Sequence, residues 1–306
     1  MRIAFLGTPE FALPSLQMLV DAGHEVALFT QPDRPKGRHG ELTPPPTKVL
    51  AVNCGLPVYQ FEKIRMPEGV AALRAFAPDL MVTAAFGQIL SKENLDIPRY
   101  GCINVHGSLL PKYRGAAPVQ WAVINGETVT GVTTMLTDVG LDTGDMLLKR
   151  AVEIGSEETG GELMERLSIV GAELLKETIE KLQGGTLERE KQNEAEATKC
   201  PMLKKEHGKV DFTRSAKEVH DLVRGVTPWP GAYAFWEDET VKLHKTRLTG
   251  SKASDTAGTC VAENERLFVN AADERIEILE LQFAGGKRMA AEAALRGRSL
   301  TGKAFQ

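Results

Sequence analysis

Short apolar runs alternate with amphipathic stretches along the first half of the chain. Runs typical of buried strands occupy residues 2–6, 25–30, 80–85, 102–105 and 129–136. Between them, apolar residues recur at helical spacing after Gly7 and over about 159–182. Strands separated by helices pair in parallel through right-handed crossovers, so the pattern predicts an α/β fold with a doubly wound, mostly parallel sheet. Ligands of such sheets bind at the carboxyl ends of the strands, where the strand order reverses.

The pattern changes after residue 189. Residues 190–208 are polar and lack an apolar period, which indicates an exposed linker between domains. A helix is predicted at about 215–224, and short strands separated by turns follow at 232–236, 241–245, 258–262, 267–270 and 275–283. Strands at this spacing indicate a small barrel or sandwich, and we expect an OB-like β-barrel. The predicted division is therefore an α/β domain over 1–189, a linker over 190–208 and a C-terminal domain over 209–306.

The composition is that of a soluble globular protein, because 42% of the 306 residues are hydrophobic and 25% are charged. No apolar run approaches the ~20 residues that a bilayer requires. The first residues already follow a strand pattern, which leaves no room for a secretory signal. The cysteines are too widely spaced for a redox pair or a zinc motif: Cys54, Cys102, Cys200 and Cys260. We expect a cytoplasmic protein with reduced thiols and no membrane contact.

The net charge of −4 does not by itself indicate a nucleic-acid partner. Cations nevertheless gather at the C-terminal end. In the last twenty residues, Glu292 is the only acid beside Lys287, Arg288, Arg296, Arg298 and Lys303. Two interpretations stay open: this end of a small barrel binds phosphates, or it is an ordinary basic surface.

The densest group of chemically active residues follows a predicted strand, in Asn104-Val105-His106-Gly107-Ser108-Leu109-Leu110-Pro111. Side chains alternate along an extended segment, so Asn104 and His106 lie on the same side. An amide donor beside an imidazole suits the stabilisation of an oxyanion, and the imidazole can also exchange a proton near neutral pH. The alternative is a hydrogen-bonded structural histidine next to an asparagine turn.

A second polar segment spans residues 138–145 and contains Asp138, Asp142 and Asp145. Its Asp, Gly and Thr residues are typical of a turn. Their spacing does not match a calcium loop. A carboxylate brought next to His106 would orient the imidazole and stabilise its charge. The residues alone do not indicate which of the three acids does so.

These segments together resemble the folate-dependent formyltransferases. The resemblance extends over Phe5-Leu6-Gly7-Thr8-Pro9-Glu10-Phe11, Gln31-Pro32-Asp33-Arg34-Pro35, residues 104–118, residues 138–145 and Trp229-Pro230-Gly231-Ala232-Tyr233. It implies three catalytic groups, Asn104, His106 and Asp142, the last being the acid of the Leu-Asp-Thr-Gly turn. It also implies a folate site lined by Ser108, Leu109, Leu110 and Pro111.

The resemblance further implies the reaction. The donor would be 10-formyltetrahydrofolate as a co-substrate, and no metal would be needed because the aryl nitrogen already activates the formyl group. The long proline-rich loop and the C-terminal domain favour the tRNA-dependent members, whose acceptor is the α-amino group of methionine on initiator tRNA. Residues 1–189 would then be the catalytic domain and residues 209–306 a tRNA-binding domain of a monomer. A formyltransferase acting on a sugar or nucleotide-precursor amine is the alternative.

Residues 31–46 form a long connection that carries Arg34, Lys36 and Arg38 among several prolines. Connections of this length without secondary structure are usually functional or disordered. The resemblance implies contact with the tRNA acceptor end, mainly through Arg38, whereas an ordinary surface loop is the simpler interpretation. The sequence departs from the family after Arg38, where His39-Gly40-Glu41 stands in place of further cations. For Lys112 and Arg114, an exposed pair without a partner and a ligand contact are equally possible readings.

Three other classes compete with a formyltransferase. A dehydrogenase would need G-x-G-x-x-G after the first strand, but the chain has Gly7-Thr8-Pro9-Glu10-Phe11-Ala12 there. A hydrolase would use water in place of the amine, and the residues 104, 106 and 142 do not discriminate against it. A non-catalytic RNA-binding module would leave those three residues without a role.

Overall fold

The computed structural model describes residues 1–37 and 40–306. These residues divide into two compact units. The first consists of Met1–Gly115, Thr130–Val152 and Met164–Lys199. The second consists of Ala116–Val129, Glu153–Leu163 and Cys200–Gln306. Each unit is described by itself.

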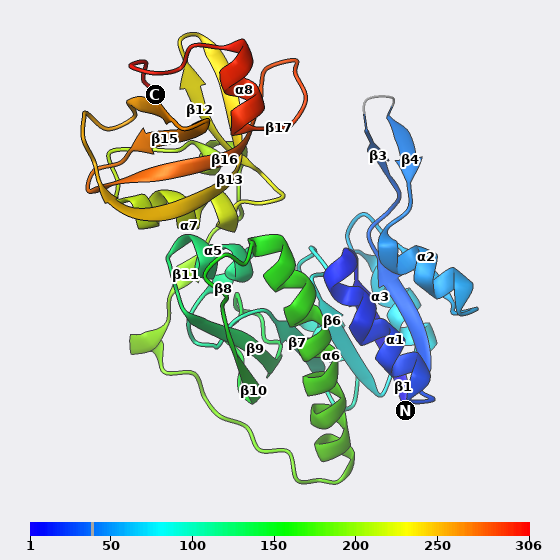
Figure 1. Cartoon of the computed structure of the whole chain (residues 1–306). Coiled ribbons are helices and arrows are strands. Elements are labelled where there is room, and N and C mark those ends of the chain that lie inside the picture. Colours follow the sequence, from blue (N-terminus) through cyan, green and yellow to red (C-terminus); the bar gives the residue numbers. More distant parts are fainter. Residues whose placement is uncertain (38–39) are drawn as a thin grey trace. The chain divides into compact units, whose positions relative to one another are not determined.

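Within its described residues, the first unit is built on a seven-stranded sheet in the order β10-β9-β7-β6-β1-β2-β5 (Figure 1). The strands are β1 (Arg2–Gly7), β2 (Glu25–Thr30), β5 (Val58–Gln60), β6 (Leu80–Ala84), β7 (Cys102–His106), β9 (Val129–Leu136) and β10 (Met146–Glu153). The pairs from β5 to β7 are parallel, and β9 runs antiparallel to β7. The predicted doubly wound, mostly parallel α/β sheet is confirmed.

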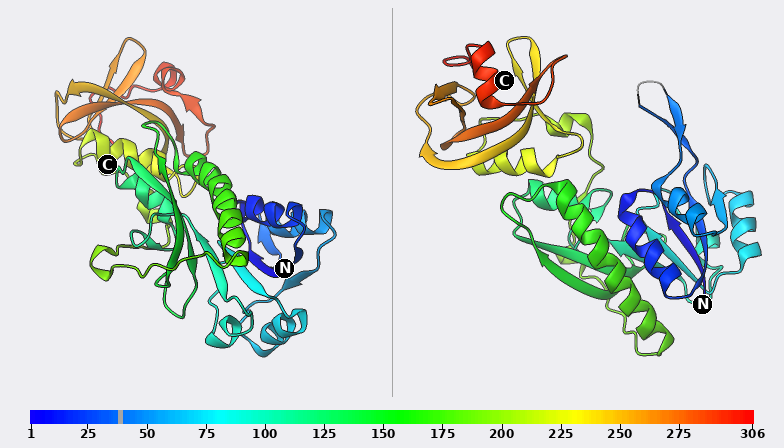
Figure 2. Two further views of the ribbon diagram at one scale, coloured as in Figure 1. Left: turned by 90° about the horizontal axis from the view of Figure 1, so that it is seen from below. Right: turned by 45° about the vertical axis from the view of Figure 1, so that its right-hand side comes forward.

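Helices cover both faces of this sheet (Figures 1 and 2). They are α1 (Leu13–Asp21), α2 (Pro46–Asn53), α3 (Pro67–Phe76), α4 (Lys92–Leu95) and α6 (Gly160–Gln183). The long helix α6 lies against β7 and β9, where a side chain at Gly171 would meet Val105 within 2.8 Å. On the opposite face, Leu73 of α3 packs in a core with Phe29 and Met81. Val105 and His106 therefore point to opposite faces of β7, as alternation requires.

The strand order reverses between β1 and β6, because the chain proceeds from β1 to β2 and β5 on one side and from β6 to β7 on the other. Gly7 ends β1 at this point and is closely packed: a Cβ there would lie 2.7 Å from the Phe5 ring and 3.1 Å from the Ala84 carbonyl oxygen. The glycine thus allows the ends of β1 and β6 to approach. The next strand beyond β6 is β7, which carries Asn104 and His106.

The connection over residues 31–46 is more ordered than predicted. Strands β3 (Arg34–Lys36) and β4 (Glu41–Thr43) pair as an antiparallel hairpin that extends away from the sheet (Figure 1). The prediction of a connection without secondary structure was therefore wrong. Gly37 and Gly40 adopt positive φ angles of 75° and 65°, which lets the chain reverse between the strands. Arg38 and His39 lie outside the described residues.

The second unit is an antiparallel β domain that also contains the helices α5 (Pro118–Ile124), α7 (Ala216–Gly225) and α8 (Ala291–Gly297). Its strands are β12 (Ala232–Trp236), β13 (Glu239–Lys252), β14 (Cys260–Glu263), β15 (Arg266–Asn270), β16 (Glu274–Phe283) and β17 (Met289–Ala290). They follow the order β12-β13-β16-β15-β14, with β17 paired to β16. The C-terminal tail bridges both edges, because Phe305 pairs with Trp236 and Ala304 with Thr259. The tail closes the sheet, which accords with the expected barrel.

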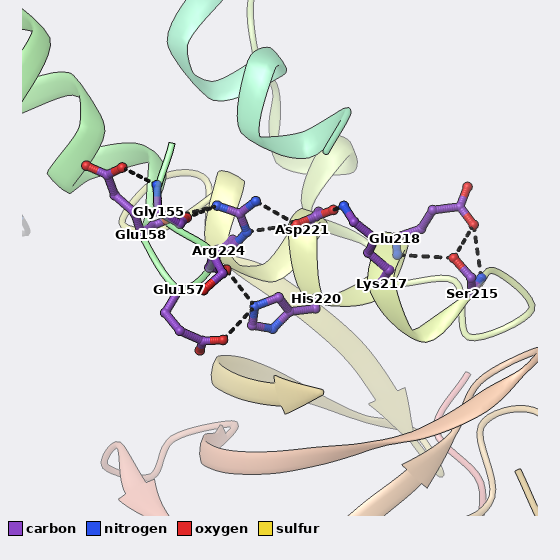
Figure 3. Close-up of polar contacts among 10 residues, drawn as sticks. Gly155, Glu157, Glu158, Ser215, Lys217, Glu218, His220, Asp221 and Arg224 are labelled. Carbon is purple, nitrogen blue, oxygen red and sulfur yellow. Dashed lines mark hydrogen bonds and ion pairs between the residues drawn. The ribbon is translucent and has the colours of Figure 1, made fainter. Parts of the chain in front are cut away.

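Helix α7 is attached to residues 155–158 of the same unit by buried polar groups (Figure 3). The Arg224 guanidinium donates to the carbonyl oxygens of Gly155 and Glu158 at 3.1 and 2.9 Å and pairs with Asp221 at 2.7 Å. Nε2 of the adjacent His220 lies 3.3 Å from the Ser156 carbonyl oxygen. Because these side chains are almost fully buried, the bonds compensate for the loss of water around them.

The described residues include all four cysteines, and none of these forms a disulfide. Burial raises the pKa of the Cys102 and Cys260 thiols to about 12, so both stay protonated and unreactive at neutral pH. Among the helices described, none has the length and apolar content to cross a bilayer.

Candidate active site

His106 ends β7, and its side chain is only 5% exposed. Nε2 of the ring lies 2.9 Å from the carbonyl oxygen of Tyr113, a residue with φ of 60°. A carbonyl oxygen can only accept a hydrogen bond, so Nε2 must carry the proton in this contact. The nitrogen that gains or releases a proton is therefore Nδ1.

Asp142 faces that second nitrogen. Its Oδ2 lies 3.8 Å from Nδ1 of His106 and accepts a hydrogen bond from the backbone N–H of Gly115 at 2.8 Å. The distance to the ring exceeds a direct hydrogen bond but fits an ion pair or one bridging donor. Asp142 has φ of 53°, the left-handed region in which Asp and Asn are tolerated better than most side chains.

The other two acids of the turn have different positions. The Asp138 carboxylate accepts hydrogen bonds from the Gly140 N–H and the Thr143 hydroxyl at 2.9 and 2.8 Å, so it shapes the turn itself. The Asp145 carbonyl oxygen accepts a hydrogen bond from the Leu136 N–H. Gly144 must be glycine here, because a Cβ would lie 1.7 Å from the Leu136 carbonyl oxygen. Of the three acids, Asp142 is the one that faces His106, as the resemblance implies.

Asn104 lies two residues before His106 on β7, on the same side of the strand, and is half-buried. The Thr83 hydroxyl of β6 donates to its Oδ1 at 3.0 Å, and the two residues are paired in register. This bond fixes the orientation of the amide, because Oδ1 accepts from Thr83 and Nδ2 is directed elsewhere. Asn104 can therefore offer an N–H donor on the His106 side of the strand.

The segment predicted to line the folate site is held in shape by Thr133 of β9. The Thr133 hydroxyl donates to the Ser108 carbonyl oxygen at 2.7 Å and accepts from the Leu110 N–H at 3.1 Å. The Ser108 hydroxyl donates to the Lys112 carbonyl oxygen, and Leu110 packs in the core with two methionines. Ser108, Leu110 and Pro111 are buried, whereas Leu109 is partly exposed. Ser108 and Leu110 thus already have structural roles.

The cations predicted to contact tRNA lie in two places. Arg34, on the hairpin with Lys36, forms a two-pronged pair with Glu62 at 3.1 and 2.6 Å. Arg38 falls outside the described residues. The C-terminal arginines are also paired: Arg288 with Glu280, Arg296 with Glu292 and Arg298 with Glu239.

Counting charges along the last twenty residues therefore overstated their excess in space. Glu239 and Glu280 come from β13 and β16, too far away in sequence to be counted. The Arg298 guanidinium also lies 3.9 Å from the centre of the Phe283 ring. Lys287 is exposed in the turn before β17.

The reading of Lys112 and Arg114 as an exposed pair is wrong for Arg114. Its side chain is 4% exposed, and its guanidinium forms two hydrogen bonds with Glu194 at 3.0 and 2.7 Å. Those bonds raise the pKa of Arg114, and the nearby charges of Asp142 and Asp138 raise it further. Gln192, whose side chain donates to the turn that carries Asp142, was not predicted either. No local pattern marks these residues, because their partners lie 50 to 80 positions away.

Among the described residues, no three His, Cys, Asp or Glu side chains gather in the way that a metal ion would require. The site is thus composed of an imidazole, a carboxylate and an amide that can exchange a proton and donate hydrogen bonds. This chemistry suits acyl transfer through a tetrahedral intermediate.

Two family models cover most of the chain. The model "Formyl transferase" matches residues 1–179, and the model "Formyl transferase, C-terminal domain" matches residues 202–299. The chain belongs to the formyl transferase family, which confirms the resemblance seen in the sequence.

Individual relatives indicate which branch of the family the chain belongs to. The chain is 53% identical to the methionyl-tRNA formyltransferase of Geotalea uraniireducens over 97% of this chain and 95% of that one. It is 49% identical to the methionyl-tRNA formyltransferase of Ruminiclostridium cellulolyticum over 98% and 97%. Within the family, the chain stands among the methionyl-tRNA formyltransferases.

A crystal structure shares the fold at lower identity. The N-formyltransferase of Helicobacter canadensis, solved with folinic acid and dTDP-3-aminofucose, superposes with a TM-score of 0.70. It is 20% identical and covers 91% of this chain and 98% of that one. Enzymes that formylate sugars are thus distant structural neighbours.

We predict that Asp142→Asn lowers the rate of formyl transfer by ~10²–10⁴-fold while the protein stays folded. Asparagine keeps the left-handed backbone and an acceptor for the Gly115 N–H, so the variant removes only the charge that faces His106. Single-turnover kinetics and a thermal melt measure the two effects. Asp145→Asn, in the same turn, is the control and should react at the normal rate; near-normal transfer by Asp142→Asn would remove this carboxylate from the mechanism.

We predict that Thr83→Val lowers kcat by about 2- to 12-fold, equivalent to ~0.5–1.5 kcal/mol, because the Asn104 amide loses the bond that fixes its orientation. Thr83→Ser keeps the hydroxyl and should retain most of the activity. Steady-state kinetics of the two variants test this. A larger loss in Thr83→Ser than in Thr83→Val would show that the threonine methyl group, and not the hydrogen bond, matters.

Proposed function

We propose that Asn104, His106 and Asp142 transfer the formyl group of 10-formyltetrahydrofolate to the α-amino group of methionine on initiator tRNA. Formylation of methionyl-tRNA is the activity of the family branch to which the chain belongs. This assignment of residues rests on the two contacts of the His106 ring: Nε2 donates to the Tyr113 carbonyl oxygen, and Nδ1 faces Asp142.

The first step is attack of the neutral amine on the formyl carbon, which places a negative charge on the formyl oxygen. Nδ2 of Asn104 can donate to that oxygen on this side of β7, and Nδ1 of His106 can do so when the ring is doubly protonated, the charged form that the facing Asp142 carboxylate favours. Fixed donors aimed at a developing oxyanion are worth ~2.7–4 kcal/mol each, because they need no reorganisation during the reaction.

The second step is proton transfer. One proton leaves the attacking amine, and one must reach the folate nitrogen as its bond to the formyl carbon breaks. Asp142 is the carboxylate beside the ring and can accept the amine proton, directly or through water. Nδ1 of His106 can pass a proton in the same region, since Nε2 stays bonded to Tyr113.

The folate donor supplies a formyl group activated by its aryl nitrogen. We assign Ser108, Leu109, Leu110 and Pro111 to the wall of its site. The partly exposed Leu109 offers a side chain to the ligand, and Thr133 keeps the backbone of the segment in one shape.

For the acceptor, we assign the hairpin cations Arg34, Lys36 and Arg38 and the C-terminal cations Lys287, Arg288, Arg296 and Arg298 to tRNA binding. Ion pairs such as Arg34 with Glu62 are exposed and weak, so a phosphate can replace the carboxylate. We assign catalysis to residues 1–189 and tRNA binding to residues 209–306, joined by residues 190–208, of which 190–199 belong to the same compact unit as the catalytic groups. We place the enzyme in the cytoplasm, where initiator tRNA is used, as a monomer.

We predict that the purified protein releases tetrahydrofolate from 10-formyltetrahydrofolate when initiator methionyl-tRNA is added. A nucleotide-linked amino sugar and water alone should support less than about 1% of that rate, which corresponds to a difference of ~2.7 kcal/mol. Absorbance of the released folate measures all three reactions. Faster reaction with the sugar amine would favour the alternative acceptor, and release without any acceptor would indicate a hydrolase.

We predict that Arg38→Ala raises KM for tRNA by about 10-fold or more and leaves KM for the folate donor unchanged. An arginine can both fork onto a phosphate and stack on a base, so its loss removes both contacts. Lys63→Ala, outside the hairpin, is the control. An equal rise of both KM values would show that the hairpin supports the fold and does not bind the acceptor.

A further inference from the structure

We propose that Gln192 is a positioning residue for formyl transfer, acting from the segment that the sequence suggests is a mere linker. The inference rests on the proposed role of Asp142. Residues 190–199, named here the strap, form hydrogen bonds with the two loops that hold the His106 ring. Gln192 joins the strap to the Asp142 turn.

The Gln192 side chain binds the Asp142 turn at two points. Its Nε2 donates to the carbonyl oxygen of Asp142 and to that of Gly144, both at 2.8 Å. Gln192 therefore donates both of its amide protons to this one turn, to the carbonyl oxygens on either side of residue 143. Glu190, earlier in the strap, forms a backbone pair with Met146 at 2.8 and 2.9 Å, where the turn enters β10. The strap thus holds the turn and its exit into β10 at three alternate positions, residues 142, 144 and 146.

Arg114 determines which way the Gln192 amide faces. Its Nε donates to Oε1 of Gln192 at 2.9 Å, and its two terminal nitrogens are bonded to Glu194, also in the strap. A guanidinium group can only donate, so the atom of Gln192 that faces it must be the oxygen. The amide nitrogen is therefore directed at the turn.

The same strap holds the other partner of His106. The Thr198 hydroxyl accepts a hydrogen bond from the Tyr113 N–H at 2.8 Å, and its carbonyl oxygen accepts from the Arg114 N–H at 2.8 Å. Tyr113 is the residue whose carbonyl oxygen contacts Nε2 of His106. Both groups that orient the imidazole are thus connected to one short segment.

The position of the Asp142 turn depends on its hydrogen bonds with the strap. The bonds of Asp138 stay within residues 138–143 and so do not fix the turn relative to β7. Val139 and Leu141 are 75% and 66% exposed, so apolar packing at these positions contributes little. A misplacement of ~1 Å can slow a reaction by up to about 100-fold. Loss of Gln192 should therefore slow the chemical step without abolishing the site.

The test compares Gln192→Ala with Gln192→Met, which keeps the length of the side chain but cannot donate or accept strong hydrogen bonds. Single-turnover transfer to initiator methionyl-tRNA, at saturating folate donor, should be about 10- to 100-fold slower in both variants. KM for the donor should stay within about 2-fold, and the melting temperature should change by less than about 2 °C. Gln183→Ala, an exposed glutamine at the end of α6, is the control and should react normally. Unchanged rates in the two Gln192 variants would overturn the proposal.

A double-mutant cycle with Asp142→Asn separates positioning from a general structural effect. If Gln192 acts through Asp142, Gln192→Ala should slow the Asp142→Asn enzyme by less than about 2-fold. The same fold-loss in both backgrounds would contradict the proposal. Near-normal transfer by Asp142→Asn alone would instead refute the proposed role of Asp142, a result that differs from either outcome for Gln192.

Discussion

The contact between Nε2 of His106 and the Tyr113 carbonyl oxygen determines how the rest of the site can work. A backbone carbonyl accepts hydrogen bonds but cannot donate them, so this contact commits one ring nitrogen to carrying a proton. Proton exchange is then restricted to Nδ1, which faces the Asp142 carboxylate. Asn104, oriented by Thr83 on the neighbouring strand, adds an amide donor on the same side of β7.

The catalytic residues lie on two kinds of structure, an interior strand of the sheet and a turn that distant segments hold in place. Asn104 and His106 belong to an interior strand of the sheet, whose neighbours β6 and β9 fix their positions. Asp142 lies in a turn between β9 and β10, whose base is closed by the hydrogen bond from the Leu136 N–H to the Asp145 carbonyl oxygen. Its place depends on hydrogen bonds from Gly115 and Gln192, which come from segments distant in the sequence. The strap also belongs to the same compact unit as the catalytic residues, since that unit extends to Lys199.

Much of this arrangement could be predicted from local patterns. The strands at 25–30 and 129–136 have the predicted bounds, because apolar runs between turns identify buried strands well. Helix α2 begins at Pro46, the last residue of the expected connection, because proline is tolerated at the first helical position. Alternation along β7 placed Asn104 and His106 on one side, but the choice of Asp142 required the family resemblance. The roles of Gln192 and Arg114 could not be predicted, because a polar segment without a period looks the same whether or not it binds a distant turn.

The most direct test of this account is the tautomer of the neutral His106 ring, measured by long-range ¹H–¹⁵N correlation NMR and assigned with a His106→Asn variant. The account predicts that the neutral ring carries its proton on Nε2. A neutral ring with its proton on Nδ1 would contradict it, because Nε2 would then have no proton to donate to the Tyr113 carbonyl oxygen.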